Sequence, residues 1–210
     1  QLNEGFMEVK RGCMIAVSAI SDIGDKILLS NGEEICYTKR KKRALREELQ
    51  KKQELMIAKI SKKKLPLTPE EYGKYYKICD GLPFAFTDIE MVFNEEKKAV
   101  DWIFRYGNEA LATLEKLPLD KMIGNSFSSL FSNMDAKWLH VYERATLYGE
   151  TLEIMDYSPE IDTNLKIICF PTFPGHCGCI LFNADQMKSI SEENHLVRLA
   201  AVAMKSNPAI

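Results

Sequence analysis

The segment PGHCGC, residues 174–179, places a histidine and two cysteines within four residues, and these side chains can bind zinc. Cys177 and Cys179 alternate with Gly178 on a predicted strand, so both thiols point to the same face. A tetrahedral zinc site usually has a Cys-x2–4-Cys pair and a second pair of ligands; this spacing differs and no second pair is evident. We therefore expect these cysteines to pack in the core, with metal binding as the alternative.

The remaining sequence has no recognisable catalytic constellation. It lacks a glycine-rich phosphate loop, a His-Glu-x-x-His motif and a Gly-x-Ser-x-Gly nucleophile elbow. The three histidines are scattered and do not define a triad. We therefore expect this chain not to be an enzyme.

Cations are concentrated between Lys39 and Lys64. Twelve lysines and arginines there stand against three glutamates, a local charge of +9 in a chain whose net charge is −2. This asymmetry raises the question of an anionic partner such as nucleic acid, but charge alone favours the alternative, a solvated helix face.

The pattern of apolar residues predicts a small first unit of strands followed by a long helix. CMIAVSAI, residues 13–20, is predicted to form a buried strand, and Asn31-Gly32 a two-residue type I′ hairpin turn. A helix over about residues 40–61 is predicted from one apolar stripe. The stripe consists of Leu45, Leu49, Lys52, Met56 and Ile60.

A second unit is predicted to begin with a capped helix, because Thr68 and Glu71 form a capping-box pattern around Pro69. Asn108 is predicted to cap a short helix, and a longer one is expected over residues 136–148. Five strands are predicted at residues 82–93, 99–106, 151–158, 164–172 and 176–185. This order predicts an α+β fold, in which a five-stranded antiparallel sheet carries helices on one face.

The second unit resembles a PAS domain over about residues 75–187. The matching segments, in order, are GLPFAFTDIEMVF, DWIFRYGNEAL and KMIGNSFSSLF. The resemblance implies a sensory or dimerisation module that often holds a small ligand between sheet and helices. The residues that would line this pocket, with core packing as their alternative role, are Trp102, Phe104, Tyr106, Trp138, Tyr142 and Cys169.

The cofactor of such a pocket stays unknown, because the sequence has no haem, flavin or metal signature. His140 lies off the apolar face of its predicted helix, where a haem ligand is not expected. No cysteine falls between residues 80 and 168, where a flavin photosensor would need its reactive thiol.

Residues 5–50 resemble the C-terminal half of a LytTR DNA-binding domain, on the segment GFMEVKRGCMIAVSAISDIGDKILLSNGEEICYTKRKKRALREEL. The resemblance implies DNA contacts at Lys10, Arg11 and Arg40, and Lys39 in the same basic segment is a further candidate. The family's first strands have no counterpart before Gln1. We therefore expect DNA binding only if the missing N-terminal half is present in the full protein.

These features predict a cytoplasmic bacterial signal-transduction protein. A partial LytTR-like unit (1–50) and a helical linker (51–74) would precede the PAS-like domain (75–187) and a helical tail (188–210). The flanking helices, 40–61 and 188–204, would allow a homodimer and would couple the PAS-like domain to its neighbours. No run of about 18 apolar residues predicts a membrane helix.

Two alternative functions stay open at this point. The chain could be a LytTR-type transcription regulator that its PAS domain tunes. It could also be the regulatory part of a diguanylate cyclase or histidine kinase whose catalytic domain lies beyond residue 210.

Overall fold

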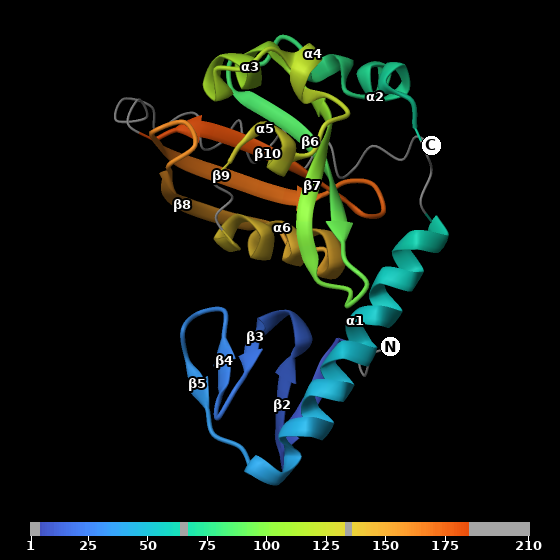
Figure 1. Cartoon of the computed structure of the whole chain (residues 1–210), viewed down its shortest axis with the longest axis vertical. Helices are drawn as coiled ribbons and strands as arrows, with labels where there is room; N and C mark the ends of the chain where they lie inside the picture. The colour runs from blue at the N-terminus through green and yellow to red at the C-terminus, as the bar shows by residue number, and fades with distance from the viewer. Residues whose placement is uncertain (1–4, 64–66, 133–135, 185–210) are drawn as a thin grey trace. The chain divides into compact units, whose positions relative to one another are not determined.

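The computed structural model describes residues 5–63, 67–132 and 136–184, and the chain divides into two compact units between Lys62 and Lys63 (Figure 1). The predicted tail helix, 188–204, lies outside the described residues. Within the described residues, no helix is long and apolar enough to cross a membrane.

The first unit contains two small antiparallel sheets and a long helix. The strands are β1 (Phe6–Lys10), β2 (Cys13–Ala16), β3 (Ile20–Ile23), β4 (Ile27–Leu29) and β5 (Glu34–Ile35). β1 pairs with β2, and β3, β4 and β5 form the second sheet. The 3-10 turn η2 (Lys39–Lys41) leads into α1 (Lys42–Lys63).

Two local predictions for this unit need correction. The continuous strand expected over residues 13–20 is wrong, because the 3-10 turn η1 (Val17–Ala19) separates β2 from β3. The hairpin at Asn31-Gly32 is confirmed, but within it only Gly32 has a positive φ, of 85°. The Leu29 N–H donates to the carbonyl of Glu33, which closes a three-residue loop in place of the type I′ turn.

Part of the apolar stripe predicted for α1 packs in the core of the first unit. Leu45 is buried and Leu49 partly buried against the strands of the first unit. A hydrogen bond also joins α1 to the strands, because Nε of Arg46 donates to the carbonyl of Ile23 at 2.8 Å. The buried residues of this small core are Met7, Val9, Ile15, Ile20, Ile23, Ile27 and Leu45.

The second unit is built on the predicted five-stranded antiparallel sheet, which is confirmed. Its strands are β6 (Ala85–Phe93), β7 (Ala99–Gly107), β8 (Leu152–Ser158), β9 (Thr163–Pro171) and β10 (His176–Asn183). The order across the sheet is β7-β6-β10-β9-β8, so the first and last strands of the unit are neighbours. This is a PAS-like arrangement.

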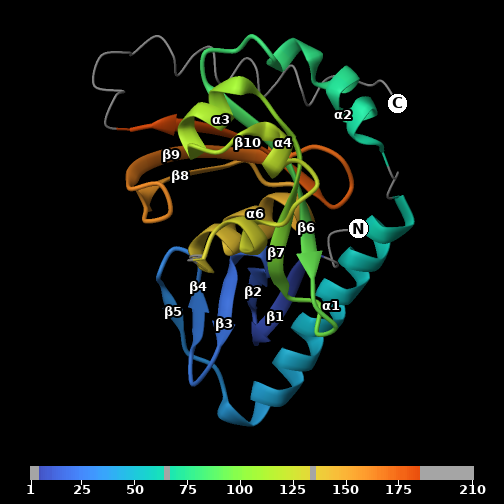
Figure 2. The ribbon, with the colours of Figure 1, turned by 45° about the horizontal axis from the view of Figure 1, so that its top comes forward.

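Helices lie on one face of the sheet, as predicted, and we call this face the inner face. They are α3 (Glu109–Glu115), α4 (Leu119–Met122), α5 (Phe127–Leu130) and α6 (Ala136–Tyr148). Figure 2 shows α6 crossing the sheet. The core on the inner face includes Ile89, Trp102, Leu111, Tyr142 and Ile167.

The opposite face, which we call the outer face, is also covered. It packs against α2 (Pro69–Tyr75) and the 3-10 turn η3 (Lys77–Cys79). The outer-face core contains Tyr72, Tyr76, Cys79, Phe86, Tyr106, Ile168, Phe170, Ile180 and Phe182. The central strands are therefore buried on both faces.

Candidate ligand-binding site

A cavity of about 30 Å³ lies between the inner face and the helices. Most of its lining is apolar or aromatic and comes from strands β6, β7, β9 and β10 and from helices α3, α5 and α6. A cavity needs about 10–15 Å³ to hold one water, so this space fits about two. A larger ligand must therefore displace some lining side chains.

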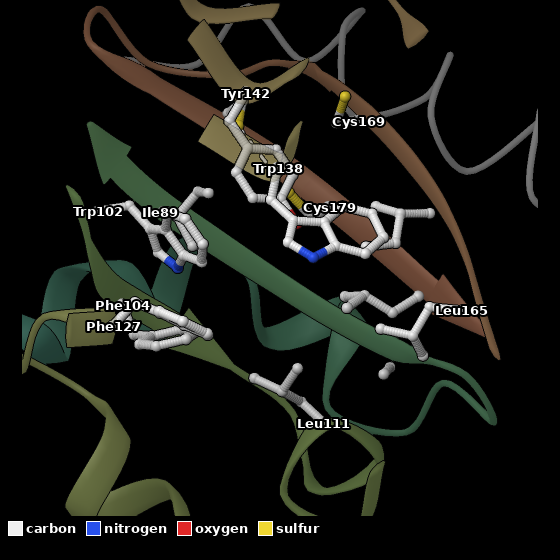
Figure 3. Packing of buried hydrophobic residues seen from close by; sticks show 14 of the residues in the cluster. Ile89, Trp102, Phe104, Leu111, Phe127, Trp138, Tyr142, Leu165, Cys169 and Cys179 are labelled. Carbon is white, nitrogen blue, oxygen red and sulfur yellow. Dashed lines mark hydrogen bonds between the residues drawn. The ribbon is translucent and has the colours of Figure 1, made fainter. Parts of the chain in front are cut away.

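Four of the predicted pocket residues line this cavity: Trp102, Phe104, Trp138 and Tyr142. Figure 3 shows them converging from β7 and α6. The ring of Trp102 lies 4.3 Å from that of Phe127 and 5.1 Å from that of Tyr142, measured between centroids. The structure thus brings these aromatic side chains together, as expected for a pocket wall.

Tyr106 and Cys169, also predicted for the pocket, do not line the cavity. Tyr106 belongs to the outer-face core, and its hydroxyl donates to Asp80 at 2.5 Å. Cys169 packs within the inner-face core, where its Sγ lies 3.7 Å from the carbonyl oxygen of Leu152. Burial raises the pKa of the Cys169 thiol, which stays protonated.

A β-bulge explains why Tyr106 changes face. Tyr106 pairs with Asp88 on β6 while Phe104 pairs with Ile89, so Arg105 is an extra residue on β7. Such an insertion interrupts the alternation of side chains along a strand. Phe104 therefore faces the cavity, whereas Tyr106 faces α2 and η3.

The polar side of the cavity is acidic. Glu115 at the end of α3 and Glu160 between β8 and β9 both line it, together with Thr87 and Ser158. Oε1 of Glu160 is buried and has no hydrogen-bond partner among the described residues. Burial, followed by the charge of Glu160, raises the pKa of Glu115 to about 7. Neither residue could be identified from the sequence, because glutamates at a helix end and in a turn usually face solvent.

A second polar group, the outer-face network, is buried between the sheet and α2. Nδ1 of His176 lies 2.6 Å from Oδ1 of Asp88, whose Oδ2 accepts hydrogen bonds from Tyr76 at 2.7 Å and Thr172 at 2.5 Å. The hydroxyl of Tyr72 lies 3.4 Å from Nε2 of His176. Since Tyr72 is on α2 and Tyr76 is at its end, the network ties this helix to the sheet.

Glu90 extends the outer-face network. Its Oε2 accepts a hydrogen bond from Nε of Arg105 at 2.6 Å and lies 3.9 Å from Nε2 of His176. Burial, followed by the Asp88 charge, raises the pKa of Tyr72 to about 12, so its hydroxyl stays neutral. This network was not predicted from the sequence, although Asp88 and Glu90 stand at alternate positions of an otherwise mostly apolar strand.

The side chains of the PGHCGC segment lie on both faces of the sheet. Cys177 and Cys179 point into the inner-face core, as expected, with their sulfur atoms 3.9 Å apart. His176 points into the outer-face network. In the part of the chain that the structure describes, no group of three or more His, Cys, Asp or Glu side chains has an arrangement that could hold a metal ion.

The candidate DNA contacts lie on the first unit and are exposed. Lys10 ends β1 and Arg11 follows it, whereas Lys39 and Arg40 are in η2. The latter two line an open groove at the beginning of α1 together with Lys42, Arg43, Arg46, Glu47 and Gln50.

Comparison with known proteins adds little to this picture. No protein-family model matches the chain, and no curated protein matches it. The crystal structure of the Rhodobacter sphaeroides LOV protein is 14% identical, covers 67% of this chain and 84% of its own, and superimposes with a TM-score of 0.45. An RsLOV variant is 13% identical, with coverages of 65% and 80% and a TM-score of 0.42. The PAS-like fold therefore rests on the strand order and pairing of the second unit itself.

Proposed function

We propose that the second unit is a sensory domain of a signal-transduction protein and that it binds a small ligand in the inner-face cavity. The observation that carries this proposal is the cavity itself, which combines an aromatic wall with a few polar groups. Binding sites for small molecules typically have this composition.

A route for the signal is suggested by the two faces of β6. Thr87 and Ile89 line the cavity, while the intervening Asp88 and the next residue, Glu90, belong to the outer-face network. A ligand that displaces the cavity wall would therefore shift the side chains that hold α2. The flanking segments, α1 and residues 188–204, would pass this change to neighbouring domains or to a second copy of the chain.

Native mass spectrometry of the purified full chain tests the ligand proposal. We expect an added mass after incubation with a pool of small metabolites, and we expect it to disappear when Trp102 is replaced by alanine in a variant that remains folded. An unchanged protein mass, with no response of tryptophan fluorescence to the pool, would contradict a ligand-sensing role.

A second function, DNA binding by the first unit, is favoured by the basic groove at the beginning of α1. Two of its cations are partly neutralised, because Lys42 lies 3.6 Å from Asp25 and Arg43 lies 2.7 Å from Glu47. Lys39 is predicted to contribute phosphate contacts that weaken with salt. A mobility-shift series from low to high salt tests this function, and a lack of any shift at the lowest salt would rule it out for this chain.

A further inference from the structure

The two carboxylates at the cavity are not compensated by an ion pair within the part of the chain that the structure describes. Among the described residues, no lysine or arginine forms an ion pair with Glu115 or Glu160. Lys116, the neighbour of Glu115, instead donates its Nζ to the carbonyl of Ile161 at 3.1 Å. A buried carboxylate is costly unless it is paired or hydrogen-bonded.

The hydroxyl groups of Thr87 and Ser158 fill this role only in part. Thr87 donates to the carbonyl of Tyr106 at 2.7 Å, and Ser158 donates to Oε2 of Glu160 at 2.6 Å. Oε1 of Glu160 is left buried and without a donor among the described residues. An unsatisfied buried acceptor in a native fold calls for a partner, which these residues do not provide.

The aromatic part of the cavity wall also favours a cation. It is formed by aromatic rings whose π faces attract ammonium groups, an attraction that strengthens when water is excluded. These rings belong to Trp102, Phe104, Phe127, Trp138 and Tyr142. The lining of the cavity thus combines two carboxylates with several aromatic rings.

We propose that the cavity binds a small organic amine, whose ammonium group lies between Glu115 and Glu160 and whose apolar part contacts the aromatic wall. This inference rests on the proposed ligand-sensing function and specifies its ligand class. The N–H groups of an ammonium ion supply the donor that Oε1 of Glu160 lacks, and its charge offsets the two carboxylates. Because the volume of about 30 Å³ holds about two waters, even a short aliphatic amine must displace part of the lining, and longer amines must displace more of it.

Tryptophan fluorescence gives a direct test, because Trp102 and Trp138 both line the cavity and are the only two tryptophans of the chain. The full chain is titrated at pH 8 with propylamine, propan-1-ol and propionate, which are similar in size but differ in charge. We expect propylamine to bind about tenfold or more tightly than the alcohol, and propionate to bind least, since charge-assisted hydrogen bonds are the stronger ones.

Two variants and one control locate the ammonium group. Glu115→Gln and Glu160→Gln should each weaken propylamine binding about tenfold, the cost of losing one charged acceptor. Glu95→Gln should leave it unchanged, because Glu95 is exposed in the turn after β6 and does not line the cavity. Thermal unfolding of each variant confirms that it is folded.

The outcomes separate this inference from the proposed function. Equal binding of the alcohol, or an affinity for propylamine that both glutamine variants retain, overturns the amine assignment but leaves a ligand-binding cavity. A response to magnesium chloride instead of propylamine would make the site one for a metal cation and would also overturn the assignment. If none of the three organic probes changes the fluorescence, the amine inference is wrong, and the metabolite experiment decides the proposed function separately.

Discussion

Nδ1 of His176 lies 2.6 Å from Oδ1 of Asp88, and both side chains are almost completely buried beneath α2. An ionised carboxylate only accepts hydrogen bonds, so the imidazole donates from Nδ1. The two residues are 88 positions apart in the sequence. They meet because β6 and β10 are neighbours in the sheet, with His176 opposite Glu90 and Gly178 opposite Asp88.

Removing the Asp88 carboxylate should strongly destabilise the second unit. Asp88→Ala leaves the donors of Tyr76, Thr172 and His176 buried without an acceptor, which we expect to cost about 3–5 kcal/mol. Urea unfolding, followed by tryptophan fluorescence at neutral pH, measures the loss.

Two milder substitutions serve as controls for this result. Tyr76→Phe removes one donor to Asp88 and should cost about 1–2 kcal/mol. Asp120→Asn, on the exposed surface of α4, should change the free energy of unfolding by less than about 0.5 kcal/mol. If Asp88→Ala lowers the free energy of unfolding no more than Asp120→Asn does, the network does not stabilise the fold.

Asn108 is expected to be a second strong determinant of stability. Its Oδ1 accepts hydrogen bonds from the backbone N–H groups of Leu111 and Phe86, both at 3.0 Å. Its Nδ2 donates to the carbonyls of Cys79 and Phe84, both at 3.0 Å. One buried side chain thus caps α3 and fixes the segment between η3 and β6.

Replacing Asn108 by alanine should cost about 3–4 kcal/mol, since a helix cap and the partners of three other buried backbone groups are lost. Asn108→Asp keeps the two accepted bonds but buries a carboxylate whose second oxygen faces the carbonyls of Cys79 and Phe84, so its cost should be at least as large as that of alanine. Thr68→Ala removes only the exposed cap of α2, and we expect about 1 kcal/mol. Denaturant unfolding should place Thr68→Ala well below both Asn108 variants, and equal costs for all three would contradict this order.

Local signals explain why much of the fold could be predicted from the sequence. The capping box of Thr68 and Glu71 is present, Asn108 caps α3, and all five strands of the second unit occur within a few residues of their expected positions. Each of these features depends on residues that are close together in the chain. The convergence of Trp102, Phe104, Trp138 and Tyr142 on one cavity then followed from the PAS-like resemblance.

The features that could not be predicted depend on tertiary structure. The bulge at Arg105 depends on how β7 pairs with β6, and strand alternation alone would place Tyr106 beside Phe104. Glu115 and Glu160 are 45 positions apart, so nothing in their local sequence indicates that they share a cavity.

Gly178 should tolerate no side chain, because a Cβ there would lie 2.9 Å from two ring carbons of Phe170 and 3.0 Å from the methyl group of Thr172. Phe170 is itself fully buried and cannot move aside freely. Gly178→Ala should therefore destabilise the protein by about 1–3 kcal/mol, the usual cost of overpacking. Chemical denaturation measures this loss.

A double variant tests whether the clash with Phe170 causes the destabilisation expected for Gly178→Ala. Phe170→Leu should be destabilising by itself, yet it makes room for the alanine. The loss in free energy of unfolding for the combined variant should then be smaller than the sum of the two single losses, by about 0.5 kcal/mol or more. Strict additivity would show that Gly178 is required for a different reason.

The stability of the second unit should fall as the pH rises through the titration of Glu115. Its folded-state pKa of about 7 is above its ordinary value of 4.5, so the folded chain binds this proton more tightly than the unfolded chain does. Between these two values the folded state is protonated and the unfolded state is ionised, which means that deprotonation destabilises the fold. The titratable groups that interact with Glu115 are Glu160 from the β8–β9 turn and Tyr142 from α6, and Cys179 from β10 lines the same cavity.

Comparison of Glu115→Gln with the unsubstituted chain isolates this effect, because glutamine does not titrate. At pH 5 the two free energies of unfolding should be similar, and by pH 8 the variant should be the more stable by about 1–3 kcal/mol. Urea unfolding at half-unit steps of pH, with Glu95→Gln as the control, measures the difference. A difference that stays constant from pH 5 to pH 8, or that favours the unsubstituted chain at the higher pH, would mean that the cavity does not hold Glu115 in its protonated form.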